Sequence, residues 1–556
     1  MKSKITIAIL LLIILGLSAK IYLLMDQYDI LLSSLIDTSS DENVTYINDK
    51  RIGQGQILNQ EGRLSLSLTS VQEYIDDEIT VSNSGQRIYV NLDQIAYSVE
   101  NERSKSYIES NLRAVNIPLI YVDGIAYIDL ETICELYAYN FKYFESTNSL
   151  VLYNAENNLY SCVVSPGTQF YKSLPNGFAK YRKVDLEETV IAFGRSEGYD
   201  MALDSEGHFV YVKDLVLDSE LSYSKAEPYT PVAVSSNEKV SLAWEAIETY
   251  QDNVKKLIKP FETGTNVISP TWFNLNVNGI VINSASREYS HTAHESGLKV
   301  WGLFKNNFDP AWTHALLESE EDQKYAIAQM LFYSSFYELD GVNFDFENIY
   351  LEDKDAFAGF IEEASREFQN AGLQVSIDIT RPGGSDQWSK VYDRTRLGRA
   401  VDYVCLMAYD EFWGSSPISG PVASLPWTKE SIEMSLNEIP PSKLVLGIPL
   451  YMRIWEETQN SKGMYVKTGS SAVTMGGFDK IASEKTLKIQ WDEDAEQYYG
   501  EYEENATIYR VWIEDETSIG ARLNLAEFFE LPGIAAWRRG YGSDLTNELF
   551  ENWIAE

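Results

Sequence analysis

Residues 339–348 read LDGVNFDFEN, and this short stretch decides how the largest part of the chain folds. Apolar and polar side chains alternate along it. The apolar positions are Val342, Phe344 and Phe346, and the polar positions are Asn343, Asp345 and Glu347. Alternation with a period of two predicts a strand whose faces differ in polarity. An uncompensated carboxylate is costly to bury, so Asp345 and Glu347 are expected to reach a solvated cleft or to be held by partners.

The sequence around this stretch, from Lys239 onward, alternates apolar strand patterns with amphipathic helical stretches. The predicted strands are KVSLAW (239–244), TNVISPTWF (265–273), LKVWGLF (298–304), LDGVNFDFE (339–347), LQVSIDIT (373–380), VDYVCLMAYD (401–410), KLVLGIPLY (443–451) and GIAAWR (533–538). Strands that alternate with helices in this number predict an α/β fold, a (β/α)8 TIM barrel over residues 239–556. An open doubly wound sheet is the alternative, but the Gly-rich phosphate loop usual in that fold does not follow the first strand.

Barrel enzymes place their sites at the C-terminal ends of the strands, and Glu347 is predicted to be the last residue of its strand. Glu347 is therefore expected at the barrel mouth, with Asp345 one layer below. A spacing of two residues separates the Cα atoms by about 6.6 Å, so one carboxylate is expected to raise the pKa of the other. A carboxylic acid that stays protonated in this way suits the cleavage of a glycosidic bond.

The stretch DGVNFDFE, from Asp340 to Glu347, resembles the signature DGxDxDxE of glycoside hydrolase family 18. Further segments are similar to that family: LMAYD at 406–410, LVLGIPLY at 444–451 and GIAAWRRGY at 533–541. Longer strings, among them VISPTWF, RPGGSDQWSKVYDR and MAYDEFWGSSPISGPVASLPW, resemble its bacterial branch of spore-cortex and peptidoglycan-directed N-acetylglucosaminidases. The resemblance covers about residues 239–556.

The resemblance implies substrate-assisted retention, in which the acetamido group of the sugar attacks its own anomeric carbon. Glu347 would be the general acid and then the base. Asp345 would orient the acetamido nitrogen and stabilise the oxazolinium charge, and Tyr409 would hold the acetamido oxygen. Trp537 would form the apolar floor of the pocket, with Met407 and Asp410 along its lining. The resemblance implies no metal and no cofactor.

Several other residues are candidates for sugar contacts. The segment 455–530 is expected to form a small α+β insertion that walls the cleft, with Trp512 and Glu514 reaching the sugar. The further aromatic candidates for sugar platforms are Trp272, Trp413 and Trp427, since aromatic faces suit pyranose rings. Asp378 either lines the cleft or forms hydrogen bonds inside the barrel. His291 and His294 form either a metal-ligand pair or, as the spacing favours, part of a solvated helix.

One residue departs from the family signature, because Asn343 stands where the family has its first aspartate. An asparagine can donate a hydrogen bond to Asp345, but it cannot share a proton or add charge. We therefore expect a substrate-binding role for Asn343 and a shifted pH profile in an active enzyme.

The N-terminus predicts a membrane anchor over residues 1–25, because Lys2 and Lys4 precede an apolar run that reaches Met25. A cleaved signal peptide is the alternative. Either feature exports the rest of the chain, so we expect a single-pass protein of the cell membrane with an extracellular body. Residues 26–80 are expected to form a stalk.

Two small β-rich modules are predicted before the barrel. Residues 81–157 resemble a copper amine oxidase N-terminal-like domain, although they contain no histidine and hence no copper site. Residues 158–220 resemble bacterial SH3-like domains, and 221–238 read as a linker.

Composition excludes some partners. The chain has 45 Lys plus Arg against 83 Asp plus Glu, a formal net charge of −38 that would repel nucleic acid. The three cysteines, Cys134, Cys162 and Cys405, are expected to be free, buried thiols, and a disulfide between the first two is the alternative.

The predicted function is hydrolysis of β-1,4 bonds next to N-acetylglucosamine in peptidoglycan or chitin-type glycans. A non-catalytic, wall-binding lectin is the alternative.

Overall fold

The computed structural model describes residues 43–48, 50–60, 62–155, 157–172, 180–196, 198–223 and 228–555. These residues divide into two compact units. The first comprises 43–79, 93–97 and 119–223, and the second comprises 80–92, 98–118 and 228–555. The predicted anchor at 1–25 and the first part of the predicted stalk lie outside the described residues. Within the described ranges, no helix combines the length and the apolar character that a membrane crossing needs.

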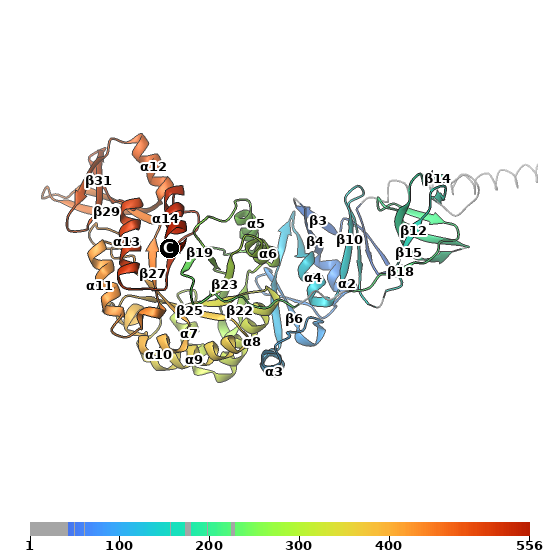
Figure 1. Ribbon diagram of the computed structural model, residues 1–556, viewed down its shortest axis with the longest axis horizontal. Coiled ribbons are helices and arrows are strands. Elements are labelled where there is room, and N and C mark those ends of the chain that lie inside the picture. The colour runs from blue at the N-terminus through green and yellow to red at the C-terminus, as the bar shows by residue number, and fades with distance from the viewer. Residues whose placement is uncertain are drawn as a thin grey trace, which may run out of the picture. The chain divides into compact units, whose positions relative to one another are not determined.

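The second unit contains a closed barrel of eight parallel strands (Figure 1). In chain order these are β19 (Val240–Glu245), β20 (Val267–Pro270), β23 (Lys299–Lys305), β24 (Gly341–Asp345), β25 (Gln374–Thr380), β26 (Tyr403–Met407), β27 (Leu444–Pro449) and β33 (Gly533–Trp537). Each strand pairs with the next, and β33 closes the ring by pairing with β19. A hairpin of β21 (Phe273–Leu275) and β22 (Val281–Asn283) extends the sheet beside β23. The predicted TIM barrel is confirmed.

Helices surround the barrel strands (Figure 1). They are α5 (Tyr250–Leu257), α6 (Arg287–Glu295), α7 (Pro310–Glu318), α8 (Glu320–Phe336), α9 (Lys354–Asn370), α10 (Arg394–Ala400), α11 (Leu425–Ser435), α13 (Glu516–Phe528) and α14 (Asp544–Ala555). A buried cluster that includes Trp244, Leu303 and Cys405 fills the space between the strands. The barrel is therefore a packed core, and substrates can reach it only at an end.

Strand β24 has the two faces that its alternation predicts. Phe344 and Phe346 are fully buried and contact Phe360 of α9. Burying each phenylalanine contributes about 1.5–3 kcal/mol, which fixes the polar set on the opposite face. The predicted strand end is wrong by two residues, because β24 ends at Asp345 and Glu347 lies in the loop that follows.

The insertion between β27 and α13 is an α+β unit with a five-stranded antiparallel sheet of order β29-β28-β32-β31-β30. Its elements are β28 (Tyr451–Gln459), β29 (Tyr465–Thr474), α12 (Met475–Glu484), β30 (Lys488–Asp492), β31 (Gln497–Glu504) and β32 (Thr507–Trp512). The predicted bounds of 455–530 are too late at both ends. The insertion starts at Tyr451, and residues 516–528 form α13, whose buried Ile519 and Leu523 belong to the barrel layer.

Asp340 joins the bottom of the barrel to the segment that precedes it. Its buried carboxylate accepts hydrogen bonds from the Tyr229 hydroxyl at 2.6 Å, from the Val232 amide at 2.7 Å and from the Val300 amide at 2.8 Å. His294 Nε2 lies 3.0 Å away, and its ring stacks on Tyr229. The predicted linker is therefore wrong for residues 228–238, which are held against the N-terminal end of β24.

Part of the predicted 81–157 module groups with the barrel. Here β5 (Thr80–Val81), β6 (Arg87–Asn91) and β7 (Ala114–Pro118) form a three-stranded sheet, beside α3 (Glu102–Asn111). The Asn116 side chain donates to the Val281 carbonyl at 2.6 Å and to the Tyr333 hydroxyl at 2.9 Å. Arg103 of α3 makes a bidentate pair with Glu367 of α9. These polar contacts, which strand patterns do not reveal, explain why the module boundary differs from the prediction.

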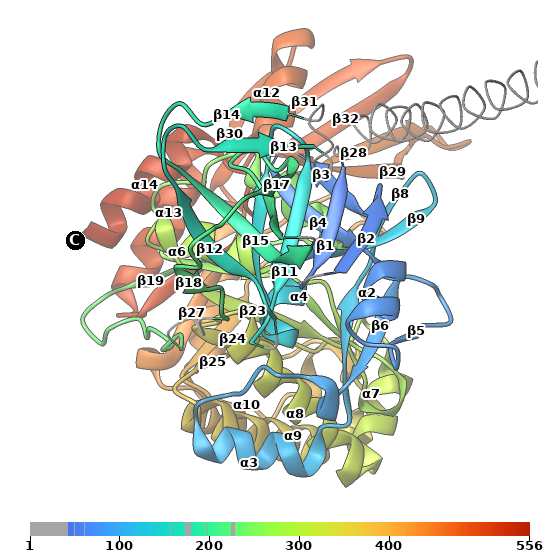
Figure 2. The same ribbon diagram turned by 90° about the vertical axis from the view of Figure 1, so that its right-hand side faces the viewer.

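The first unit contains three sheets (Figure 2). One has the order β10-β11-β1-β2, with β1 (Val44–Ile47), β2 (Lys50–Gln54), β10 (Asn140–Phe144) and β11 (Ser149–Tyr153). A second joins β3 (Ile57–Gln60), β4 (Arg63–Ser67), β8 (Ile120–Val122) and β9 (Ile125–Asp129), with the helices α2 (Leu68–Tyr74) and α4 (Leu130–Tyr137). The stalk prediction is therefore wrong for residues 44–74. Strand β1 is fully buried because it pairs with β11, about a hundred residues later in the chain.

The third sheet of the first unit has seven strands in the order β14-β13-β17-β16-β15-β12-β18. They are β12 (Tyr160–Val164), β13 (Gln169–Tyr171), β14 (Lys180–Lys183), β15 (Glu188–Ser196), β16 (Tyr199–Leu203), β17 (Phe209–Val212) and β18 (Ser219–Glu220).

The cysteines Cys134, Cys162 and Cys405 are free and buried, which confirms the prediction of free, buried thiols. The resemblances to a copper amine oxidase N-terminal-like domain and to an SH3-like domain stay predictions.

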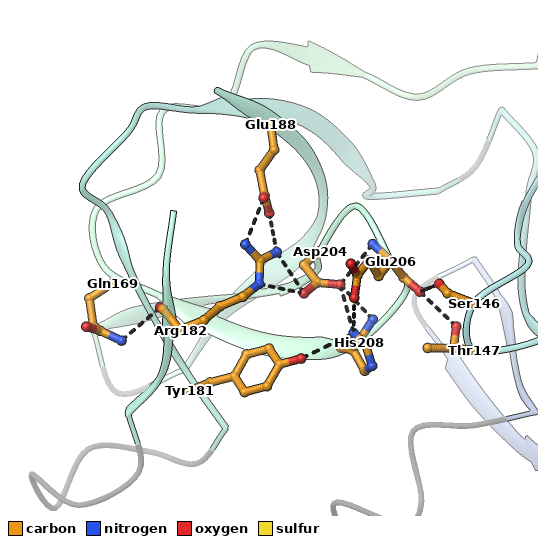
Figure 3. Close-up of polar contacts among 9 residues, drawn as sticks. All are labelled: Ser146, Thr147, Gln169, Tyr181, Arg182, Glu188, Asp204, Glu206 and His208. Carbon is orange, nitrogen blue, oxygen red and sulfur yellow. Dashed lines mark hydrogen bonds and ion pairs between the residues drawn. The ribbon is translucent and has the colours of Figure 1, made fainter. Parts of the chain in front are cut away.

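A buried carboxylate organises the tip of this seven-stranded sheet (Figure 3). Asp204 accepts hydrogen bonds from the His208 amide at 2.9 Å and from Arg182 Nη2 at 2.9 Å, and Arg182 also pairs with Glu188. Gly207 adopts φ +86°, and a Cβ there would lie 2.5 Å from the Thr147 side chain. The turn therefore requires glycine, and Asp204 has a structural role.

Candidate active site

Glu347 projects from the first loop residues beyond β24, and Asn306 fixes its backbone. The Asn306 side chain accepts from the Glu347 amide at 3.1 Å and donates to the Glu347 carbonyl at 2.7 Å. The Tyr392 hydroxyl holds the preceding residue, Phe346, through its carbonyl at 2.8 Å. These hydrogen bonds take the place of the backbone hydrogen bonds to neighbouring strands, so Glu347 has a defined position although it lies outside β24. Sequence reasoning missed Asn306, whose only signal is a polar residue directly after β23.

Asp345 lies one layer below Glu347, at the last position of β24. Its Oδ1 is buried and has no hydrogen-bond partner among the described residues. Burial raises the pKa of Asp345 to about 6, against the opposing effect of Lys305, its register neighbour on β23. Lys305 is itself paired with Glu248 at 3.1 Å. Asp345 is therefore a carboxyl group that gains or loses its proton near neutral pH.

Glu347 has the more strongly perturbed carboxyl group. Burial raises the pKa of Glu347 well above its usual value, and the negative charges of Asp345, Asp378 and Asp410 raise it further. A negatively charged neighbour disfavours the ionisation of a carboxyl group, as burial does, so the two effects on the pKa of Glu347 add. Glu347 is therefore protonated under conditions in which an ordinary glutamate is charged, which is the state that a general acid needs.

Aromatic residues lie at or just beyond the C-terminal ends of β19, β26 and β33. The ring of Trp244 lies 6.0 Å from that of Trp537 and 6.5 Å from that of Tyr409. Trp537 and Tyr409 are half-buried and pack on the barrel core. Burial raises the pKa of Tyr409 well above its usual value, so its hydroxyl remains a hydrogen-bond donor. The predicted companions Tyr409 and Trp537 thus lie at the C-terminal end of the barrel, as Asp345 and Glu347 do.

The loop after β26 contributes Asp410. Its Oδ1 accepts a hydrogen bond from the Tyr451 hydroxyl at 2.6 Å, and Arg453 Nη2 lies 3.8 Å away. Both partners belong to β28, so the insertion is tied to the barrel mouth at this point. Met407, the last residue of β26, is half-buried. Tyr451 and Arg453 were not predicted, although Tyr451 stands in a segment that resembles the family.

Asn343 does not line the mouth, and this prediction is wrong. The residue is fully buried, and its amide is saturated inside the barrel. Its Oδ1 accepts from Trp244 Nε1 at 2.9 Å and from Ser269 Oγ at 3.1 Å. Its Nδ2 donates to Ser376 Oγ at 2.9 Å and to Asp378 Oδ1 at 2.8 Å. Asn343 therefore donates to Asp378 and not, as predicted, to Asp345.

Two more predicted sugar contacts are buried structural residues. Trp272 is fully buried, and its Nε1 donates to Asn253 at 2.7 Å. Glu514 forms an ion pair with Arg522 at 2.7 Å and is one of the residues that line a cavity of about 420 Å³ next to α12. Trp272 is enclosed by packing, and both carboxylate oxygens of Glu514 already accept hydrogen bonds from Arg522 and Ser518.

The remaining aromatic candidates differ in exposure. Trp512 is half-buried at the end of β32, where its Nε1 donates to Asp492 at 2.9 Å. Trp413 is 52% exposed, whereas Trp427 is half-buried beneath Arg381. Phe308, which sequence reasoning missed, is 51% exposed and pairs with Trp388. Exposed aromatic rings in loops next to the barrel mouth are surfaces on which a sugar ring can stack.

The two predicted histidines have separate carboxylate partners. His294 contacts Asp340, as described, and His291 lies 3.0 Å from Glu338. The described residues contain no group of three or more His, Cys, Asp or Glu side chains arranged to hold a metal ion.

Comparison with known proteins agrees with the geometry of the site. Residues 287–542 match the family described as glycosyl hydrolases family 18. The chain carries a family 18 glycosyl hydrolase domain. An uncharacterized glycosylase of Bacillus subtilis, YvbX, is 24% identical over 299 residues, which are 51% of this chain and 83% of that protein. The cortical fragment-lytic enzyme of Bacillus subtilis is 30% identical over 43% of this chain and 54% of its own length.

The solved structures support the same fold for the family 18 domain. The spore cortex-lytic enzyme SleL of Bacillus cereus superposes with a TM-score of 0.50 at 21% identity, covering 61% of this chain and 78% of SleL. With its family 18 domain and its glycosylase relatives, the protein is a glycoside hydrolase. The chain spans about half the length of the cortical fragment-lytic enzyme that it matches.

Proposed function

We propose that the protein is a membrane-anchored glycosidase of the cell envelope, which cleaves β-1,4 bonds next to N-acetylglucosamine in peptidoglycan. One observation carries the proposal: Glu347 and the half-buried Asp345 lie together at the C-terminal end of β24, where burial and neighbouring negative charges raise the pKa of Glu347. The names of the cortical fragment-lytic relatives favour peptidoglycan as the glycan. The basic and apolar residues 1–25 favour attachment to the membrane, with the body outside.

In the proposed reaction Glu347 donates its proton to the leaving oxygen. The acetamido oxygen of the sugar attacks the anomeric carbon from the other face and forms an oxazolinium ion. Asp345 accepts a hydrogen bond from the acetamido nitrogen and offsets the positive charge that develops there. The Tyr409 hydroxyl donates to the acetamido oxygen, and Trp537 supports the apolar face of the ring. Glu347 then removes a proton from water, which opens the oxazolinium ion with net retention.

The test uses the purified full-length chain with purified peptidoglycan and, in parallel, with oligomers of N-acetylglucosamine. We expect soluble fragments from peptidoglycan, with new reducing ends that are N-acetylglucosamine by mass spectrometry after reduction. Faster cleavage of the oligomers would identify a chitin-type substrate instead. Sedimentation of the chain with the wall, without any new reducing end, would favour the lectin.

The pH profile gives a separate prediction. Asp345 must be ionised, and its pKa is about 6, so kcat/KM is expected to rise as the pH increases through about 6. Glu347 must be protonated, so kcat/KM is expected to fall as the pH increases through its raised pKa. The measurement is kcat/KM on a soluble oligomer between pH 4 and 9. A maximum near pH 4 followed by a loss of activity by pH 6 would contradict the assigned roles.

A further inference from the structure

Asp378 and Asp345 occupy neighbouring positions on neighbouring strands. Strands β24 and β25 are parallel, and their register pairs Asn343 with Ser376 and Phe344 with Ile377. The next positions in this register are Asp345 and Asp378. Since inward and outward side chains alternate in both strands, the two carboxyl groups point into the barrel at the same level, on backbones about 4.8 Å apart.

The surroundings of Asp378 hold its carboxyl group in place without supplying a positive charge. The residue is 1% exposed. Its Oδ1 accepts from Asn343 Nδ2 at 2.8 Å, and its Oδ2 accepts from Trp244 Nε1 at 3.1 Å. The thiol of Cys405, its register partner on β26, also donates to it. Three neutral donors orient the group, but they do not neutralise a buried carboxylate.

Asp345 shows the complementary feature. Its buried Oδ1 lacks a hydrogen-bond partner within the described ranges. The charged or titratable groups that interact with the two carboxyls come from several elements: Lys305 on β23, Glu347 after β24, Tyr392 before α10, Cys405 on β26 and Tyr409 after β26. Lys305, the one cation among them, is paired with Glu248. Two neighbouring carboxyl groups, one fully buried and one half-buried, cannot both be charged without a large cost, so the pair holds one proton.

We propose that Asp378 is a positioning residue that shares one proton with Asp345, and that it supplies from β25 the carboxyl group that position 343 lacks. The inference rests on the proposed function, because it assigns a partner to Asp345 in that reaction. The total charge of the pair stays at −1. While Asp345 faces the neutral acetamido group, the proton lies between the two carboxyls. As the oxazolinium ion forms, the proton resides on Asp378, and Asp345 carries the negative charge that offsets the cation.

The expected defect of Asp378→Asn follows from this division. Asp345 would be charged throughout the cycle, so it would already bind the acetamido group strongly in the ground state, and this part of its interaction does not lower the barrier. We expect kcat to fall about 10²-fold, the lower end of the range for lost proton transfer, and the acid limb of kcat/KM to move to lower pH.

The exchange variant Asn343→Asp/Asp378→Asn separates this role from a structural one. Trp244 Nε1 and Ser269 Oγ already donate to position 343, and an amide at 378 can donate back to a carboxylate at 343. The buried donors and acceptors therefore keep their hydrogen-bond partners, while the carboxyl group that shares the proton moves from β25 to β24. We expect the exchange variant to recover kcat to within about tenfold of the wild type, since each proton partner is again present. Asp386→Asn, a change at an exposed carboxylate that pairs with Lys390, is the matched control.

A second readout does not depend on activity. Burial and the charge of Asp345 raise the pKa of Asp378 well above its usual value, so its contribution to stability is lost as the pH rises above its unfolded pKa. Asp378→Asn should therefore gain stability relative to the wild type between pH 5 and pH 8, and the exchange variant should return to wild-type behaviour. Urea unfolding of the full-length chains at both pH values measures this.

The outcomes separate the two proposals. An Asp378→Asn variant with the wild-type pH profile, an exchange variant no more active than Asp378→Asn, or equal pH dependence of stability in all chains overturns the role of Asp378. A wild-type chain that cleaves no glycan, together with the expected pH dependence of stability, supports the shared proton and overturns the proposed function instead.

Discussion

Replacing Glu347 with glutamine is expected to lower kcat by at least about 10³-fold on any glycan that the wild type cleaves. Glutamine keeps the size of the side chain and leaves the backbone bonds of Asn306 to residue 347 intact. What it removes is the proton for the leaving oxygen and the base for the incoming water. KM is expected to change little, because the lost interaction belongs to the transition state. Initial rates of both chains at the pH optimum of the wild type measure the effect.

A matched control is Glu352→Gln, a change at an exposed glutamate five residues further along the chain, in the short 3-10 helix Leu351–Asp353. It should leave kcat unchanged. Glu347→Gln should also unfold at a higher urea concentration than the wild type at pH 8. The reason is that a carboxyl with a raised pKa costs stability once the pH exceeds its unfolded pKa, and glutamine cannot ionise. Retention of more than a tenth of the activity by Glu347→Gln would exclude Glu347 as the general acid.

Asp340→Ala is expected to cost about 3–5 kcal/mol of stability, although Asp340 belongs to the same sequence motif as Glu347. The change leaves the buried amides of Val232 and Val300 without their acceptor, together with the Tyr229 hydroxyl and His294. Each donor that is left without an acceptor costs about 1–3 kcal/mol of stability, and water that enters the site offsets part of this cost. The kcat of the chains that remain folded should match the wild type, because Asp340 lies at the opposite end of β24 from Asp345.

Tryptophan fluorescence is suited to this measurement, since all twelve tryptophans lie between residues 244 and 553. Urea unfolding followed by this signal therefore reports on the unit that contains the barrel. Asp386→Ala provides the control for removal of a carboxylate, because that side chain is exposed. A loss of less than 1 kcal/mol for Asp340→Ala would contradict the structural role assigned to this residue.

The barrel was predictable because its strands bury both faces, and strands of that kind leave continuous apolar runs such as LVLGIP. The carboxyl pair was predictable because alternation along one strand fixes the face of each side chain. The residue at which β24 ends was not predictable. Asn306, some forty residues earlier in the chain, replaces the strand ladder at Glu347, and no local pattern records that contact.

Burial across layers explains the remaining errors at the site. Trp272 and Glu514 have residue types common in sugar sites, but Asn253 and Arg522 enclose them in the packing between layers. Asn343 was expected to contact Asp345, two residues away on its own strand. It donates instead to Asp378, which lies one level further along the neighbouring strand β25, and no pattern within one strand records a contact of this kind.

The N-terminal part shows the same limit. Strand β1 is four residues long, within a polar stretch that reads as a spacer. Its pairing with β11 makes it a buried strand, and only a contact between distant segments reveals this. The polar residues Asn116 and Arg103 likewise join part of the predicted small module to the barrel helices and the β21–β22 hairpin.

The most direct test of the account is the anomeric configuration of the first product, followed by proton NMR during the first minutes of hydrolysis of a β-linked N-acetylglucosamine oligomer. Glu347 as acid and base, with Asp345 supporting an acetamido nucleophile, predicts that the β-anomer forms first and that the α-anomer appears later by mutarotation. The α-anomer as the first product would mean that water attacks directly, and it would contradict the roles assigned to both carboxyl groups.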